Sequence, residues 1–162
     1  MSTPTRSRGR RRIVLAGLAV VAVVVTFVLV YFQPQKLFID DHVNETIPVA
    51  GRVAERMGRF VSRDHGTEGT ATIYRLDDGR RILRIEDLHT SNGPALVVYL
   101  SANPADGREG AFDDTYVDVG GLKGNIGDQN YEIPDDVKVE DYMSVVIWCE
   151  RFSAAFGAAD LA

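Results

Sequence analysis

The sequence predicts an all-β domain, an antiparallel β-sandwich or barrel-like fold, preceded by one N-terminal transmembrane helix. The first observation is a long uncharged run that begins at residue 13 and is apolar almost throughout. The second is the pattern of residues 58–162, where short β-prone segments alternate with turn residues and no long helical periodicity appears. These roughly 105 residues are enough for one hydrophobic core of this kind.

The N-terminal region has the order of charge and hydropathy that is typical of a membrane anchor. Residues 1–12 contain five arginines and no acidic residue, and the uncharged run follows directly. At about 1.5 Å per residue this run extends roughly 30 Å, the thickness of the hydrocarbon core of a bilayer. A cleaved signal peptide is the alternative, but its apolar region is usually only about 7–15 residues long and ends at small residues. We therefore expect a basic cytoplasmic tail over residues 1–12 and a transmembrane helix over residues 13–33.

The arginines also predict the orientation, because basic residues beside a span remain on the cytoplasmic side. The rest of the chain would then lie outside the cytoplasm, on a single-pass protein of the cell membrane. Removing the five arginines from the 18 basic residues leaves 13 basic against 23 acidic residues, a net charge of −10. Such a domain repels nucleic acids, so the expected partners are the membrane, through residues 13–33, and an unknown redox or other protein of the cell envelope.

Residues 34–57 are predicted to form an extracytoplasmic stalk in front of the β domain. Pro34 ends the helix, and the polar residues that follow show no sustained periodicity. Within residues 49–57, the apolar positions 50, 53, 54 and 57 fall on one helical face. This spacing predicts a short helix at the end of the stalk.

The β domain of residues 58–162 begins with a predicted hairpin. The β-prone segments 70–76 and 81–86 flank Asp77-Asp78-Gly79, and Asp-Gly between two such segments favours a tight turn because glycine accepts a positive φ. Further strands are expected over residues 95–101, 116–119, 129–133 and 144–156.

The last predicted strand, residues 144–156, is the most apolar. Its aromatic residues Trp148 and Phe156 share one parity, which predicts that this parity faces the core. Cys149 would then lie on the opposite face, beside Arg151. A strand buried on both sides would not obey this parity argument.

Cys149 is the only cysteine in the chain, so no intramolecular disulfide can form. An exported domain usually pairs its cysteines, and a single one suggests a reactive thiol or a bond to another chain. Free cysteine also behaves as a small buried hydrophobe, and the segment Val-Val-Ile-Trp-Cys is typical of a core strand. The residues alone leave three possibilities open: an inert core residue, a redox or ligand-binding group, and a link to a partner.

Several motifs, taken in order, resemble a known family, the DM-thirteen domain, also called the electron transfer DM family. The resemblance covers residues 58–162. Its motifs are Gly58-Arg59-Phe60, His65 with Gly69, Thr90-Ser91-Asn92-Gly93-Pro94 before Val98-Tyr99-Leu100-Ser101, residues 122–134 (LKGNIGDQNYEIP) and residues 142–149 (YMSVVIWC).

This resemblance implies an all-β extracytoplasmic domain with an electron-transfer role. It implies that Cys149 is the centre of that role, as a redox thiol or as the ligand of a prosthetic group such as haem. His65 matches the pattern of the family and would be a second cofactor-binding residue. His89 falls at a variable position, so no ligand role is assigned to it.

Other chemistries lack their sequence signals. The three histidines and one cysteine form no spacing that zinc sites favour, and the nucleophile motif Gly-x-Ser-x-Gly is absent. The sequence therefore shows no recognisable hydrolase or transferase, and two hypotheses remain. One is an exported redox module centred on Cys149. The other is a non-enzymatic interaction module of the cell envelope with an inert core cysteine, in which Tyr99, Tyr116, Tyr131 and Trp148 would supply stacking faces.

Overall fold

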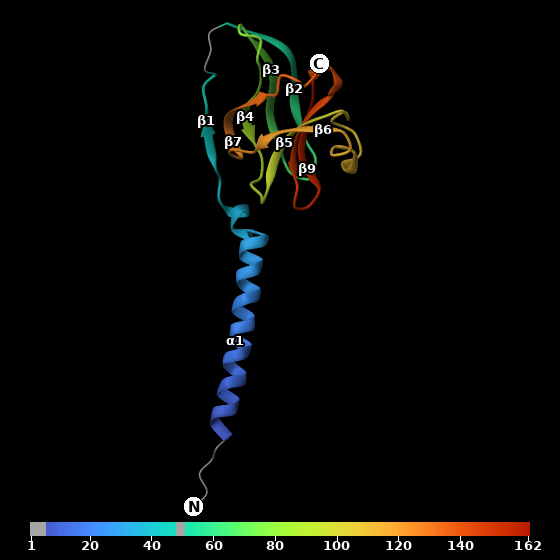
Figure 1. The fold of residues 1–162 in the computed structure, drawn as a ribbon. Helices are drawn as coiled ribbons and strands as arrows, with labels where there is room; N and C mark the ends of the chain where they lie inside the picture. The colour runs from blue at the N-terminus through green and yellow to red at the C-terminus, as the bar shows by residue number, and fades with distance from the viewer. Residues whose placement is uncertain (1–5, 48–50) are drawn as a thin grey trace, which may run out of the picture. The chain divides into compact units, whose positions relative to one another are not determined.

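The computed structural model describes residues 6–47 and 51–162 of the chain. It divides into two compact units, one that ends at Gln35 and one that runs from Lys36 to Ala162. We describe each unit by itself (Figure 1).

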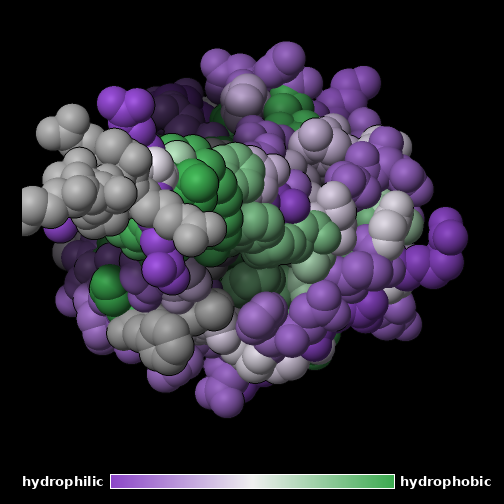
Figure 2. Space-filling model, turned by 90° about the horizontal axis from the view of Figure 1, so that it is seen from below, coloured by the Kyte–Doolittle hydropathy of each residue, from purple (hydrophilic) through white to green (hydrophobic). Residues whose placement is uncertain are grey.

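The first unit contains helix α1 (Arg6–Tyr31). Its segment Gly9–Tyr31 is long and apolar enough to cross a membrane, a property that a signal sequence near the N-terminus shares. Figure 2 shows the apolar residues of this helix in green, whereas the visible surface of the β domain is mostly hydrophilic and purple. One candidate membrane span near the N-terminus is therefore present, as the sequence predicts.

The second unit is an all-β domain, which confirms the predicted fold class. Within its described residues, 36–47 and 51–162, nine strands form one sheet in the order β1-β7-β4-β3-β2-β9-β8-β5-β6. Every described pairing is antiparallel except that of β1 with β7, which is parallel. The strands are β1 (His42–Asn44), β2 (Arg52–Ser62), β3 (Glu68–Leu76), β4 (Arg81–His89), β5 (Leu96–Ser101), β6 (Tyr116–Gly121), β7 (Ile126–Ile133), β8 (Ser144–Cys149) and β9 (Ala154–Asp160). Short 3-10 turns cover Pro34–Phe38, Glu109–Ala111 and Val139–Asp141.

The sheet curls into a half-barrel because β2 belongs to both of its halves. The first part of β2 pairs with β3, and its last three residues pair with β9. On the other side of the domain, β6 comes close to β7: a Cβ added to Gly120 in β6 would lie 3.6 Å from the ring of Tyr131 in β7. The two ends of the strand order therefore approach each other around a common interior.

Two hydrophobic clusters fill the domain. The main core occupies the inside of the curled sheet and includes Leu83, Ile85, Val98, Ile147 and Cys149. The outer core lies on the other face of β5, β8 and β9, against the loop of residues 102–115. It consists of Val97, Tyr99, Ala105, Phe112, Val146, Trp148, Ala155 and Ala158. Strand β8 is therefore covered on both faces.

The hairpin at Asp77-Asp78-Gly79 is confirmed. The backbone N–H of Leu76 donates to the carbonyl of Arg80 at 2.9 Å, and Gly79 has a φ of 89°, which a residue with a Cβ adopts only under strain. The strand predicted over residues 144–156 is wrong in one respect. It is two strands, β8 and β9, joined by a turn at residues 150–153 in which Ser153 has a φ of 49°.

The short helix predicted over residues 49–57 is also wrong. Residues 48–50 lie outside the described part of the chain, but Arg52–Ser62 forms β2. Most side chains of this strand are exposed or half-buried, so its apolar residues do not show the period of two that marks a strand with one buried face. Pairing with β3 and β9, which no local pattern reveals, decides its conformation.

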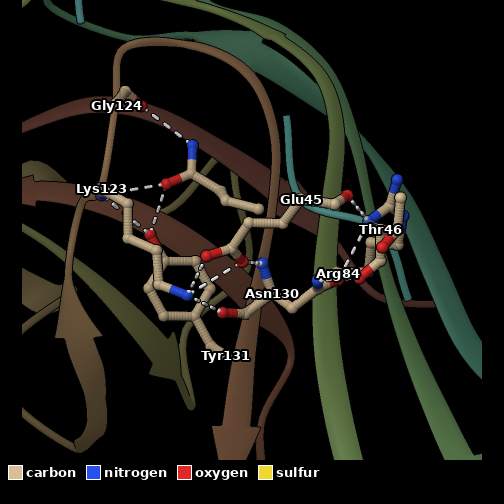
Figure 3. A network of polar contacts seen from close by, with 8 residues as sticks. Glu45, Thr46, Arg84, Lys123, Gly124, Asn130 and Tyr131 are labelled. Atoms are coloured by element: carbon tan, nitrogen blue, oxygen red, sulfur yellow. Dashed lines mark hydrogen bonds and ion pairs between the residues drawn. The ribbon is translucent and has the colours of Figure 1, made fainter. Parts of the chain in front are cut away.

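Part of the segment expected to be a stalk pairs with the sheet through β1, and Figure 3 shows the polar network that holds it. The Lys123 ammonium donates to both carboxylate oxygens of Glu45, at 2.8 and 2.9 Å. The Glu45 carboxylate also accepts the backbone N–H of Asn130, and Arg84 donates to the Glu45 carbonyl oxygen at 2.9 Å. A groove of about 650 Å³ adjoins this network. Because its charged groups already pair with one another, we interpret the network as a clamp for β1.

Candidate functional site

Cys149 is the last residue of β8 and is completely buried. Its thiol donates a hydrogen bond to the carbonyl oxygen of Pro94, with an Sγ–O distance of 3.2 Å. On its two sides it pairs with Leu96 of β5 and Ala154 of β9. The sulfur is therefore enclosed by packed strands, and solvent does not reach it.

The face predicted for Cys149 is wrong. Cys149 and Ile147 point into the main core, and Trp148 points into the outer core. The parity argument fails because β8 is a central strand that is buried on both faces, so an apolar side chain fits either side. Arg151 lies in the turn at residues 150–153 and not on the strand, so it does not share a strand face with Cys149.

The loop that receives the thiol hydrogen bond, residues 90–95, is fixed by buried amides. The side-chain amide of Asn92 donates to the carbonyl oxygen of Ile39 and to the Asp41 carboxylate, both at 2.9 Å, and its oxygen accepts the N–H of Gly93. The Asn125 amide donates to the carbonyl oxygen of Thr90, also at 2.9 Å. These contacts give the motif at residues 90–94 a structural role: they place the Pro94 carbonyl over Cys149.

A haem does not fit at Cys149. Ligand pockets in proteins usually have volumes of about 300–1,000 Å³. The pocket beside the 92–96 loop has a volume of about 120 Å³, and Cys149 is not among the residues that line it. Since the sulfur is completely buried, the residues present provide no space for a macrocycle.

His65 lies in the turn between β2 and β3 and is half-buried. Its ring packs on that of Phe156, with centroids 3.8 Å apart. Phe156 in turn packs beside Gly93, which precedes the residue that binds the Cys149 thiol. The structure thus links His65 to the loop over Cys149 through Phe156, and no hydrogen bond joins His65 and Cys149 within the described residues.

A stack of aromatic residues lies on the outer face of the strands that enclose Cys149. The rings of Tyr99 and Tyr116 stack with centroids 4.1 Å apart, and the ring of Tyr99 lies 6.3 Å from that of Trp148. The Tyr99 hydroxyl donates to the Glu150 carboxylate at 3.4 Å. Burial raises the pKa of Tyr99, and the neighbouring Tyr116 and Glu150 raise it further.

The sequence predicted stacking faces at Tyr99, Tyr116 and Trp148, but it did not predict that these residues stack on one another. No local pattern reveals the stack, because the register between β5, β6 and β8 creates it. Tyr131 does not belong to it. Its ring lies in the main core, its hydroxyl donates to Gln129 at 2.6 Å, and burial raises its pKa.

Within residues 6–47 and 51–162, no group of three or more histidine, cysteine, aspartate or glutamate side chains is arranged to hold a metal ion. The arrangement at Cys149 is instead a shielded thiol in the main core, and the ring of Trp148, the residue before it, lies in the outer core on the other face of β8. Because the sulfur is completely buried, it does not contact a substrate bound at the surface of the domain.

Comparison with known proteins gives one match. The family model described as Electron transfer DM13 matches residues 59–161, which is more than half of the chain. No curated protein matches the sequence, and no solved structure matches it. The matched span begins in β2 and ends just after β9, so it covers the strands that build both cores. The chain therefore belongs to the electron transfer DM13 family.

Proposed function

We propose that this protein is an electron-transfer module held at the outer face of the cell membrane, and that Cys149 is its redox group. The observation that carries the proposal is the environment of the thiol in a domain of this family. It is completely buried and hydrogen-bonded to Pro94, yet directly follows Trp148 in the chain.

Burial separates two kinds of thiol chemistry. Disulfide exchange needs contact between two sulfur atoms, and a thiolate that is accessible to its partner. An electron, in contrast, can tunnel through packed protein, so a sulfur without solvent contact can still be oxidised. Loss of one electron and of the thiol proton would leave a sulfur radical on Cys149. The electron would pass to a one-electron carrier of the cell envelope, and the proton would reach water when the loop of residues 90–95 that covers the thiol opens. The proposal is therefore one-electron chemistry at a shielded sulfur.

The test compares the full-length protein with Cys149→Ser and, as a matched control on the same strand and in the same core, Ile147→Val. We expect mediated redox titration of the native protein to detect a one-electron couple that Cys149→Ser abolishes and Ile147→Val retains. A maleimide should label the native thiol only after unfolding.

A Cys149→Ser protein with an unchanged couple and full cellular function would show that the cysteine is only a packing residue. A native protein in which no couple is detected would lead to the same conclusion. The domain would then be an interaction module of the cell envelope.

We further propose that Gly9–Tyr31 anchors the protein uncleaved, with the arginine-rich end in the cytoplasm. The physical reason is the asymmetry of charge around a span of bilayer length. Protease added to intact spheroplasts should remove the β domain and leave a fragment that contains the N-terminus. Complete protection of the β domain, with digestion only after lysis, would show the opposite orientation.

A further inference from the structure

Three oxidisable rings lead from the surface of the domain to the residue that precedes Cys149. Tyr116 is 42% exposed, Tyr99 is buried beneath it, and Trp148 is 2% exposed in the outer core. The centroid distances along this series are 4.1 and 6.3 Å. Electron tunnelling slows steeply with distance, so two short steps between such rings are faster than one long step from the surface to β8.

We propose that electrons leave this domain at Tyr116, and that they reach it from Trp148 by way of Tyr99. These three residues are called the aromatic path below. The end of the path at Cys149 rests on the function proposed above, but the path itself is defined by the rings alone.

Each electron-transfer step between the tyrosines has a proton acceptor and a proton donor, which are water and the Glu150 carboxylate. An oxidant takes one electron from Tyr116, and its phenolic proton leaves to water. The Tyr116 radical then takes an electron from Tyr99 and a proton from water, while the Tyr99 proton moves to the Glu150 carboxylate, to which its hydroxyl already donates. The Tyr99 radical next takes an electron from Trp148 and recovers its proton from Glu150. The net change is one electron lost by Trp148, which becomes a radical cation, and one gained by the oxidant.

The charges on the surface around Tyr116 predict the charge of the oxidant that would bind there. Asp113, Asp114, Asp118 and Glu150 are exposed in the segments next to Tyr116 and Tyr99. A patch of one sign speeds the approach of a partner of the opposite sign, and salt weakens this effect. The path therefore fits a one-electron oxidant with a positively charged surface.

Flash photolysis of the full-length protein in lipid nanodiscs tests the path, with a cationic ruthenium tris-bipyridine complex as oxidant and persulfate as its electron acceptor. The chain has a single tryptophan, so the tryptophan radical band reports Trp148 alone. We expect Tyr116→Phe and Tyr99→Phe to slow its formation by about tenfold or more, which corresponds to about 1.4 kcal/mol in the barrier. Phenylalanine keeps the ring packing and removes the oxidisable phenol.

Two comparisons accompany these variants. Tyr74→Phe makes the same chemical change on β3, outside the path, and should leave the rate unchanged. At low salt an anionic hexachloroiridate oxidant should react more slowly than the cationic complex, and added salt should reduce the difference. If both path variants form the tryptophan radical as fast as the native protein, the aromatic path is wrong.

Cys149→Ser separates this inference from the proposed function. If Cys149 supplies the electron that refills Trp148, the tryptophan radical should live longer in this variant. An unchanged lifetime, together with slowed formation in the two tyrosine variants, would keep the path and remove Cys149 as its end.

Discussion

Replacement of Arg84 by methionine is expected to destabilise the β domain by about 3 kcal/mol, because it removes one partner from a buried set of charges. The Arg84 side chain is only 7% exposed. Its guanidinium pairs with Asp128 at 2.6 Å and with Glu86 at 2.8 Å, and it also donates to Asn130 and to the Glu45 carbonyl oxygen. Methionine fills much of the same volume, but these acceptors lose their donor and two carboxylates lose the cation between them. The partial exposure of both carboxylates places the expected loss at the low end of the range for buried pairs.

Urea unfolding of the full-length protein in detergent, followed by fluorescence of the buried Trp148, measures this loss. Arg80→Met provides the matched control, since Arg80 also pairs with two carboxylates but at an exposed position of the same hairpin. Exposed pairs contribute little, so this variant should unfold close to the native midpoint. Equal midpoints for the native protein and Arg84→Met would show that the buried charges add nothing to stability.

Replacement of Gly58 by alanine is expected to destabilise the domain by at least about 3 kcal/mol, the upper end of the cost of overpacking. A Cβ at this position would overlap with the backbone carbonyl oxygen of Asp160. That backbone cannot move away easily. Leu161 N–H donates to the carbonyl oxygen of Met143, and Ala162 and Met57 exchange two backbone hydrogen bonds of 3.0 Å. The requirement for glycine is therefore steric and comes from the close approach of the last residues to β2.

Gly66→Ala is the matched control, because it is the same chemical change in the turn between β2 and β3. No atom lies within 4 Å of the Cβ that it would add. Its thermal midpoint should equal or slightly exceed that of the native protein, since alanine reduces the freedom of the unfolded chain. A Gly58→Ala protein that melts like Gly66→Ala would contradict the steric argument.

Local sequence signals predicted the elements whose shape depends on nearby residues. The β3–β4 hairpin follows from Asp-Gly between two β-prone segments, and the apolar helix follows from length and charge alone. Strand β2 escaped prediction because its side chains are mostly exposed and its pairing partners are distant in sequence. The turn after Cys149 was not predicted either, since its residues Glu-Arg-Phe-Ser contain neither glycine nor proline.

In the candidate site, too, local features could be predicted from the sequence and features that depend on strand pairing could not. The presence of one unpaired cysteine can be read from the sequence, and the family resemblance directs attention to it. Whether its sulfur faces solvent depends on the strands beside β8, and sequence parity gave the wrong face. The stack of Tyr116, Tyr99 and Trp148 depends on the register of three strands, which no single segment encodes.

The position of β2 between β3 and β9 also sets the order in which the domain can be completed during synthesis. Strand β2 joins the two halves and is made early, whereas its partner β9 (Ala154–Asp160) follows all the other strands in the chain. Contacts that close such long loops form late, because the chain loses much conformational entropy before they are made. The guanidinium of Arg56 in β2 donates to the carbonyl oxygens of Val139, Tyr142 and Leu161, so these hydrogen bonds also form only after the later residues have been made. A ribosome-bound chain in which β9 has not yet been made therefore holds an open sheet, and the half-barrel closes around its thiol only after β9 has paired with β2.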